Sequence, residues 1–241
     1  MTWSLIARDP NGHFGVAIAS RFFAVGALCV HTRRGVGALS TQALMNPMYG
    51  PAGMELLAGG VAPAEVVARL TDADDGRGQR QLHLIGATGH AVAHTGSDCV
   101  TWYGHHVGSD FSVAGNMLAG AQVLEATVEA FLDSDGAPLA ERLLAAMSAG
   151  DAAGGDKRGK QAAALRIHGA EDYPSLDIRV DDHAEPIVEL QRLYEKSLER
   201  FQPFVSCLAG RDDPVGLLHR DDIEGRVEAF AAERRARAER R

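Results

Sequence analysis

The first twenty residues constrain the fold most, because they read as a β-hairpin that begins at the second residue. In the stretch TWSLIAR, which starts at Thr2, the residues Trp3, Leu5 and Ala7 share one face of an alternating pattern. A strong turn signal at 9–12 (DPNG) leads into a second alternating stretch, FGVAIAS. We therefore expect the N-terminal strand to be central to the fold, with the Trp3 face turned toward the core.

The rest of the chain separates into blocks of strands and blocks of helices. Further strands are expected at residues 27–32, 36–41, 81–85, 90–95, 100–103, 111–116, 162–168 and 176–180. Helices are expected at residues 51–57, 63–70, 123–132, 139–147 and 186–198. Segregated blocks of this kind favour the α+β class over a repeating βαβ sheet.

The organisation of the 241 residues predicts one domain over 1–200 and a C-terminal helical extension over 201–241. The extension ends in a helix rich in arginine, glutamate and alanine. Phe201, Phe204 and Leu208 at its start are apolar and need something to cover them. We expect the extension to pack against a second subunit, which gives a homodimer or larger homo-oligomer.

Composition and charge exclude several classes of protein. The formal net charge of -8 argues against a nucleic-acid partner, because phosphate binding needs a positive surface. No apolar run approaches the roughly 20 residues that span a bilayer, and the N-terminus lacks a secretory signal pattern, so no membrane partner is expected. Cys29, Cys99 and Cys207 are widely spaced and form no CxxC pair. This usage predicts a cytoplasmic protein without a disulfide framework.

No motif in the sequence indicates a cofactor-binding or metal-binding site. The nucleophile elbow GxSxG, the phosphate loop GxxxxGK[ST] and a GxGxxG after a strand are all absent from the sequence. His90 and His94 lie about 13 Å apart along an expected strand and cannot share one zinc ion. His105 and His106 are expected in a turn. We therefore predict neither a cofactor nor a metal site.

Thr2 is the sharpest candidate for chemistry. Once Met1 is removed, a free α-amine with a pKa of about 7.7–8.0 lies beside the threonine hydroxyl. Such an amine can act as the base for its own nucleophile, which then attacks an amide or ester carbonyl. The alternative interpretation is that threonine is a good strand residue and a common second residue.

Two other groups of polar residues suggest a binding site. The first gathers at the ends of expected strands, and its members are Ser20, Arg21, Thr41, Gln42, Asn46, His94, Thr95 and Asn116. The second is the segment GGDKRGKQ over residues 154–161, in which Asp156, Lys157 and Arg158 are charged. Its glycines free backbone N–H groups to converge on an anion, and the two cations add positive charge. A solvated turn remains the alternative for this segment.

Several long motifs carry a family resemblance. The start of the chain resembles an N-terminal-nucleophile (Ntn) hydrolase of the proteasome-like kind, in which the mature chain begins with threonine and the second strand ends in Ser-Arg. From Thr2 to about Glu195 the chain is similar to an uncharacterised bacterial family, domain of unknown function 1028, of the Ntn-hydrolase-like superfamily. The matching motifs are ARDPNGHFGVAIASRFFAVG, GVGALSTQALMNPMYGPAGMELLAGG, HTGSDC, GNMLAG, AGGDKRGKQAAAL and DIRVDDH. The fold that this resemblance implies is a four-layer αββα sandwich.

The resemblance also implies an activity, the cleavage of a C–N (amide) bond in a small-molecule substrate by a cytoplasmic amidohydrolase. Thr2 is then the nucleophile, Ser20 and Arg21 steady it, and Asn116 or a backbone N–H faces the oxyanion. The expected substrate-binding residues are Thr41, Gln42, Asn46, Asp156, Lys157 and Arg158.

A non-catalytic ligand-binding or assembly protein that keeps the fold is the alternative function. Two features of the sequence favour it: Ala19 stands where the proteasome-like pattern has an acid, and residues 28–32 contain no lysine.

Overall fold

The computed structural model describes residues 2–239, which form two compact units. The first unit extends to Leu190 and the second begins at Gln191. Helix α6 (Pro186–Glu199) contains this division. The first unit holds both β-sheets and all of the predicted site residues. The domain boundary expected at residue 200 stays a prediction.

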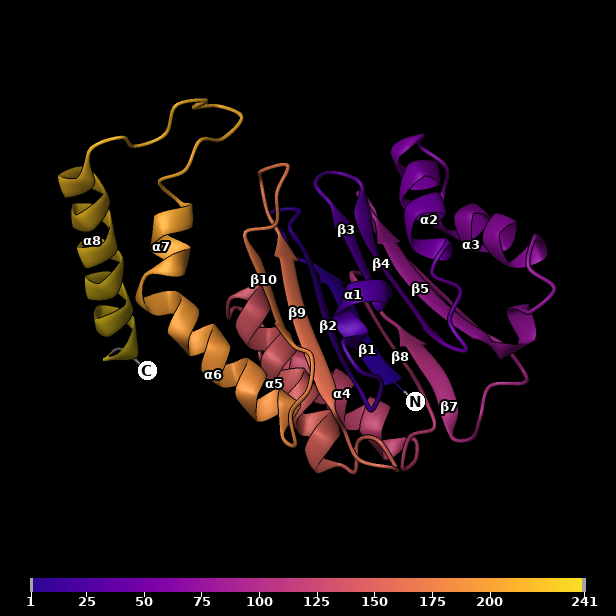
Figure 1. Cartoon of the computed structure of the whole chain (residues 1–241). Coiled ribbons are helices and arrows are strands. Elements are labelled where there is room, and N and C mark those ends of the chain that lie inside the picture. Colours follow the sequence, from indigo (N-terminus) through magenta and orange to yellow (C-terminus); the bar gives the residue numbers. More distant parts are fainter. Residues whose placement is uncertain (1, 240–241) are drawn as a thin grey trace. The chain divides into compact units, whose positions relative to one another are not determined.

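The larger of the two sheets is antiparallel, with the strand order β10-β9-β2-β1-β8-β7. Its strands are β1 (Thr2–Arg8), β2 (Phe14–Ser20), β7 (Tyr103–Val107), β8 (Phe111–Asn116), β9 (Ala162–His168) and β10 (Leu176–Val180). The two strands of the predicted N-terminal hairpin are both present, and β1 lies between β2 and β8 (Figure 1). The expectation of a central N-terminal strand is confirmed as to its place in the sheet.

The smaller sheet is also antiparallel, with the strand order β3-β4-β5-β6. Its strands are β3 (Val30–Arg33), β4 (Gly37–Ala43), β5 (Arg80–Gly86) and β6 (Gly89–Thr95). A short 3-10 helix, η1 (Arg77–Gln79), precedes β5. Two antiparallel sheets with separate helices confirm the α+β class.

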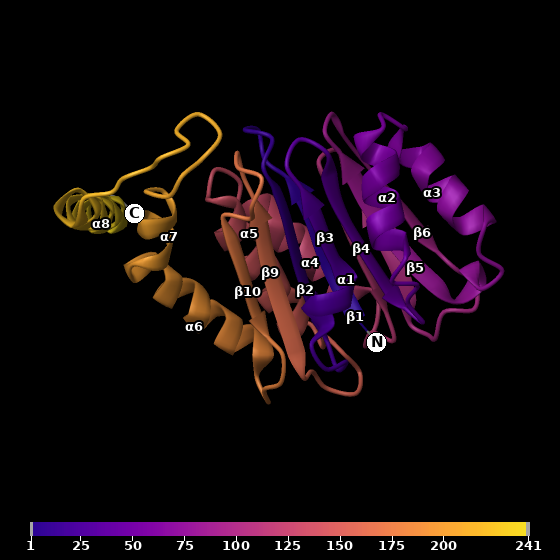
Figure 2. The ribbon, with the colours of Figure 1, turned by 45° about the horizontal axis from the view of Figure 1, so that its top comes forward.

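A pair of helices contacts each sheet (Figure 1, Figure 2). Helices α2 (Tyr49–Ala58) and α3 (Pro63–Asp72) pack on the smaller sheet. Helices α4 (Gln122–Asp133) and α5 (Leu139–Ala152) pack on the larger sheet and against each other. The apolar spacing that predicted α4 and α5 is thus explained by burial of one helix face against the larger sheet.

Strand β1 is buried on both faces, whereas the alternation of its sequence predicted one core face. Its odd face contacts α5, where a Cβ added at Gly150 would lie 3.1 Å from Nε1 of Trp3. Its even face looks into the smaller sheet, and there Oγ of Ser4 donates a hydrogen bond to Oε1 of Gln42 at 2.7 Å. Ile6, on the same face, belongs to an apolar cluster shared by the two sheets. The polar residues on the even face are therefore interior residues.

The strand predicted over 27–32 is only partly correct. The structure has a short helix, α1 (Val25–Cys29), followed by β3. The helix begins after Ala24, whose φ of 51° places it in the left-handed region. Val25 and Cys29 are buried in the apolar cluster between the sheets. Periodicity alone does not separate a short apolar helix from a buried strand, which is why the pattern misled.

The strand predicted over 100–103 lies further along the chain, as β7 from Tyr103 to Val107. His105 and His106 are consequently on a strand and not in a turn. β7 is the edge strand of the larger sheet and pairs only with β8 there. An exposed edge strand is held by its ladder of backbone hydrogen bonds, so its side chains carry no strong apolar signal.

The second unit consists of the end of α6, with α7 (Phe201–Val205) and α8 (Arg220–Ala238). Arg200 donates to both carboxylate oxygens of Glu224, at 2.8 and 2.6 Å, and Arg234 donates to Glu195 at 3.0 Å. Packing of this unit against a second subunit stays a prediction. Of the helices in residues 2–239, none has an apolar stretch long enough to span a lipid bilayer.

Candidate functional site

Thr2 is the first residue of β1, and its side chain is held by the strand beside it. Thr2 lies directly opposite Ser20 in the pairing of β1 with β2. The hydroxyls of the two residues are 2.9 Å apart, and Oγ of Ser20 also accepts the backbone N–H of Phe22 at 2.9 Å. Only 5% of Thr2 is exposed. The predicted nucleophile and its predicted neighbour are therefore in contact.

The carbonyl oxygen of Thr2 is held by two side-chain amides. It accepts a hydrogen bond from Nδ2 of Asn116 at 3.3 Å and one from Nε2 of Gln42 at 3.4 Å. Nδ2 of Asn116 also donates to Oε1 of Gln81 at 3.1 Å, so both of its hydrogens have acceptors. In this structure Asn116 and Gln42 position the main chain of Thr2. The roles predicted for them, oxyanion donor and substrate contact, stay predictions.

Ser4 and His83 continue this set of hydrogen bonds deeper between the sheets. Oγ of Ser4 donates to Gln42 and lies 2.8 Å from Nε2 of His83. Because a hydroxyl has one hydrogen, Nε2 of His83 must be the donor to Ser4. Nδ1 of His83 then accepts the hydroxyl of Ser112, which lies 3.1 Å away. Burial, with a smaller effect from the charge of His105, lowers the pKa of His83 to about 3. His83 is consequently a neutral, oriented histidine at physiological pH.

Gln81 joins the two sheets at the centre of the same network. Its Nε2 donates to the carbonyl of Gly115 on β8 at 2.9 Å, while its Oε1 accepts from Gln42 at 2.6 Å. Nε2 also lies 3.0 Å from Oγ1 of Thr95, which in turn is 2.9 Å from Nδ1 of His105. Below, the term polar network denotes Thr2, Ser4, Ser20, Gln42, Gln81, His83, Ser112 and Asn116.

Half of the polar network is not among the site residues predicted from the sequence, namely Ser4, Gln81, His83 and Ser112. A signal was present in the sequence. Gln81 and His83 are two residues apart in β5, where they flank Leu82, and Thr2 and Ser4 are two residues apart in β1. Polar residues at this spacing share one face of a strand. When both faces of the strand are covered, that face is an interior polar layer.

In the loop with the sequence GGDKRGKQ, the backbone N–H groups of Gly154, Gly155 and Gly159 donate to carbonyl oxygens of the same chain. The side chain of Asp156 is fully buried, and its Oδ1 accepts the backbone N–H of Arg158 at 2.7 Å. The guanidinium of Arg21 donates to the carbonyl oxygen of Arg158, and Lys157 is exposed. Burial raises the pKa of the Asp156 carboxyl, while hydrogen bonding to the backbone of Arg158 opposes this effect. The structure thus joins Arg21 to this loop, and substrate binding by the loop stays a prediction.

Thr41 and Asn46 belong to a separate group of residues. Oγ1 of Thr41 donates to the carbonyl oxygen of Asn46 at 3.3 Å, and Nδ2 of Asn46 donates to Asp74 at 3.1 Å. Tyr49 and Arg80 also donate to this carboxylate, at 2.8 and 3.1 Å. The hydrogen bond from Asn46, with those from Arg80 and Tyr49, holds the pKa of Asp74 well below its usual range. These contacts stabilise a loop, and binding of substrate there stays a prediction.

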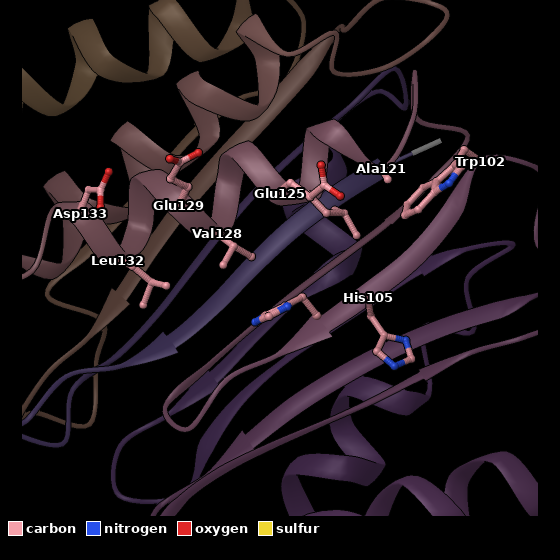
Figure 3. Close-up of a pocket in the computed structure, with 10 residues that line it drawn as sticks. Trp102, His105, Ala121, Glu125, Val128, Glu129, Leu132 and Asp133 are labelled. Atoms are coloured by element: carbon pink, nitrogen blue, oxygen red, sulfur yellow. The ribbon is translucent and has the colours of Figure 1, made fainter.

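A groove of about 540 Å³ lies between strand β7 and helix α4 (Figure 3). Trp102 lies near one end of the groove, beside Ala121, and Asp133 lies near the other end. The remaining lining residues are His105, His106, Leu124, Glu125, Val128, Glu129 and Leu132. Thr2 does not line this groove. His105 connects the groove to the polar network through the contact with Thr95 described above.

Metal-binding side chains do not cluster in the described part of the chain. Among residues 2–239, no group of three or more histidine, cysteine, aspartate or glutamate side chains is placed to hold a metal ion. Cys29, Cys99 and Cys207 are buried free thiols, and burial raises the pKa of Cys29 to about 12.

Known proteins place the first unit in one family. The model described as a family of unknown function, DUF1028, matches residues 2–190. The crystal structure of protein SPO2555 from Silicibacter pomeroyi, which carries the same family assignment, is similar with 30% sequence identity and a TM-score of 0.84. That similarity covers 91% of this chain and 96% of that one. No curated protein matches the chain.

A second solved structure is similar at a much lower level. It is Anbu, an ancestral β-subunit, from Yersinia bercovieri, with 14% identity and a TM-score of 0.37. The similarity covers 81% of this chain and 94% of that one. A similarity this low fixes neither fold nor function.

Proposed function

The chain belongs to the DUF1028 family of unknown function, and on that premise we propose that it is an N-terminal-nucleophile amidohydrolase. The proposal includes the four-layer αββα fold of that superfamily and a small amide as substrate. One observation carries it. At the N-terminal end of β1, the hydroxyl of Thr2 makes a 2.9 Å hydrogen bond with that of Ser20 on β2, and removal of Met1 would place a free amine beside the same Thr2 hydroxyl.

The chemical step needs only groups of this residue and a water molecule. The α-amine of Thr2 takes the proton of Oγ1 as Oγ1 forms a bond to the carbonyl carbon of the amide. The amine then passes this proton to the leaving nitrogen, the C–N bond breaks, and an ester on Thr2 remains. Water hydrolyses the ester and restores Thr2, so one amide and one water give one acid and one amine.

The surroundings of Thr2 support a role that depends on orientation. Asn116 and Gln42 hold the Thr2 carbonyl, and Ser20 holds its hydroxyl, from three different strands. Fixing a nucleophile in this way lowers the entropy cost of reaching the transition state.

A ligand-binding protein without catalysis is the second candidate. The groove between β7 and α4 favours it, since this groove is apolar in part and Thr2 does not line it. Ala19, which stands where an acid is expected next to Ser20, is fully buried and supplies no charge. On this hypothesis the polar network has a structural role only.

Intact mass and a panel of small amides separate the two candidates. Active protein should begin at Thr2, hydrolyse at least one amide, and form an ester on that residue. Thr2→Val, which keeps the shape of the side chain, should abolish hydrolysis, and Thr2→Ser should retain part of it. Thr32→Val is the matched control on another strand.

Hydrolysis by Thr2→Val, or by protein that still carries Met1, would exclude Thr2 as the nucleophile. Ligand binding at the groove without turnover would favour the second candidate.

A further inference from the structure

The loop over residues 155–161 crosses the N-terminal end of β1. On one side the loop pairs with the segment that follows β8. Leu118 and Asp156 form an antiparallel β-bridge there, and the N–H of Ala119 donates to the carbonyl oxygen of Gly155 at 3.1 Å. On the other side, the N–H of Gln161 donates to the carbonyl of Ser20 at 2.8 Å. β8 and β2 are the two neighbours of β1 and run antiparallel to it. The loop therefore bridges the extensions of both neighbours, just beyond Thr2.

Asp156 brings an unsatisfied carboxylate oxygen to this place. Its side chain is 0% exposed, and Oδ1 is occupied by the N–H of Arg158. Oδ2 is buried as well, and no donor within residues 2–239 forms a hydrogen bond with it. Leaving a buried charged acceptor without a donor is costly, and native structures rarely do so without a functional reason.

The cationic side chains near Asp156 in residues 2–239 form no hydrogen bond with its Oδ2 atom. The guanidinium of Arg158 approaches Oδ1, with Nε 3.8 Å away. Arg21 directs its guanidinium to the carbonyl oxygen of Arg158, and Lys157 is exposed. Hydrogen bonding from the backbone of Arg21 also acts on this carboxyl, but no donor in residues 2–239 forms a hydrogen bond with Oδ2, so Oδ2 is suited to one more positively charged donor.

We propose that Asp156 is a positioning residue whose Oδ2 binds the α-ammonium group of Thr2 in the chain that begins at Thr2. This inference rests on the proposed function and revises the substrate-binding role predicted for Asp156. The carboxylate stabilises the ammonium that forms when the amine takes the Oγ1 proton, and it aims that proton at the leaving nitrogen. It also supplies the negative charge that Ala19 lacks.

The test is the pKa of the Thr2 amine, measured by NMR on the full chain labelled with ¹⁵N-threonine. The protein is made with a cleavable leader whose removal leaves Thr2 first, so the measurement does not depend on processing in the cell. In the unchanged sequence the amine should titrate above the ordinary α-amine range of about 7.7–8.0. Asp156→Asn keeps the shape of the side chain and should lower this pKa by about one unit, a tenfold change in the protonation equilibrium.

Two further variants make the test specific. Asp151→Asn removes a nearby carboxylate that pairs with Lys160, and it should leave the amine pKa unchanged. Arg158→Gln removes the guanidinium beside Oδ1 and should raise the amine pKa, which tests the inference even if Asp156→Asn does not fold.

The outcomes separate the two proposals. An amine pKa that is equal in the unchanged protein, Asp156→Asn and Arg158→Gln would overturn the role of Asp156, whether or not amides are hydrolysed. An amine pKa that falls in Asp156→Asn, in a protein that hydrolyses no amide, would support the contact and count against the proposed function alone.

Discussion

The interface between the two sheets has a polar half and an apolar half, and both are buried to the same degree. Under β1 and β8 the smaller sheet presents Gln42, Gln81 and His83, which form hydrogen bonds with residues of the larger sheet. Under β2 and β9 the contact is made by an apolar cluster that includes Ile18 and Ile85. The two halves lie side by side in one layer, yet they hold the sheets together by different physical means.

The difference between these halves separates stability from geometry. Apolar contacts stabilise in proportion to the area removed from water, about 25 cal/mol per Å², and have no preferred direction. Buried hydrogen bonds add little net stability, but each is directional and costly to leave unmade. The polar half is also the half that reaches Thr2, through Asn116 and Gln42. We infer that the apolar half holds the fold together and the polar half fixes the position of Thr2.

The largest effect is expected from Gln81→Leu, which places an apolar side chain at the centre of the polar half. Asn116 would lose Oε1 of Gln81 as an acceptor, and the carbonyl of Gly115 would lose Nε2 of Gln81 as a donor, whereas Gln42 keeps the carbonyls of Thr2 and Ala114 as acceptors. At about 1–3 kcal/mol for each buried group left without a partner, the free energy of unfolding should fall by roughly 2–6 kcal/mol. Urea unfolding measures it. Gln122→Leu, on the exposed start of α4, is the control and should change stability by less than about 0.5 kcal/mol. Equal stability of the Gln81 variant and the unchanged protein would show that the network is not coupled.

A slightly smaller effect is expected from Ile18→Ala in the apolar half. Ile18 is fully buried, and truncation leaves a cavity, which typically costs about 2–5 kcal/mol. Because no hydrogen bond to Thr2 is lost, the pKa of the Thr2 amine should stay within about 0.3 units of its original value, whereas Gln81→Leu should move it further. Leu132→Ala, 51% exposed, is the control for stability. A large shift of the amine pKa in Ile18→Ala would contradict the division of roles.

The smallest effect is a dependence on pH that arises only in the polar half. The pKa of His83 is lowered to about 3 in the folded protein from 6.5, so His83 folds neutral and becomes charged on unfolding in acid. Its contribution is therefore complete above pH 6.5 and is lost as the pH falls toward 3. The loss is about 1.4 kcal/mol for each pH unit, or about 2 kcal/mol between pH 6.5 and 5.

His83→Gln tests this expectation, because an amide side chain does not titrate. Chemical unfolding between pH 5 and 8 should show a weaker loss of stability in acid for this variant than for the unchanged protein. His219→Gln, at an exposed position before α8, should follow the unchanged protein. Parallel curves for His83→Gln and the unchanged protein would mean that His83 is not the neutral, buried group described here.

Local patterns predicted most of the secondary structure. The alternation in TWSLIAR and FGVAIAS predicted β1 and β2, and the bounds expected for β9 and β10 agree with the structure. Period-two and period-3.6 patterns are visible in sequence because each residue's environment depends on its near neighbours. The failures lie where local pattern is ambiguous, at the short apolar helix α1 and at the exposed edge strand β7.

The candidate site was predicted only in part. The family resemblance predicted that Ser20 steadies Thr2, and in the structure the two-strand hairpin holds these two residues opposite each other. Asn46 and Thr41 were grouped with them on the basis of strand ends alone, but in the structure they contact each other and a loop around Asp74. Position at the end of a strand does not tell which edge of which sheet that strand occupies.

The sequence by itself determined the strands, the helices and the hairpin that puts Thr2 beside Ser20. Only the tertiary structure decided that the even face of β1 is interior and that amides from β4 and β8 meet at the Thr2 carbonyl. Asn116 is 114 residues from Thr2 along the chain. Stacking of one sheet on another is set by the burial of all their faces together, so no single strand records which residue of the other sheet it will meet.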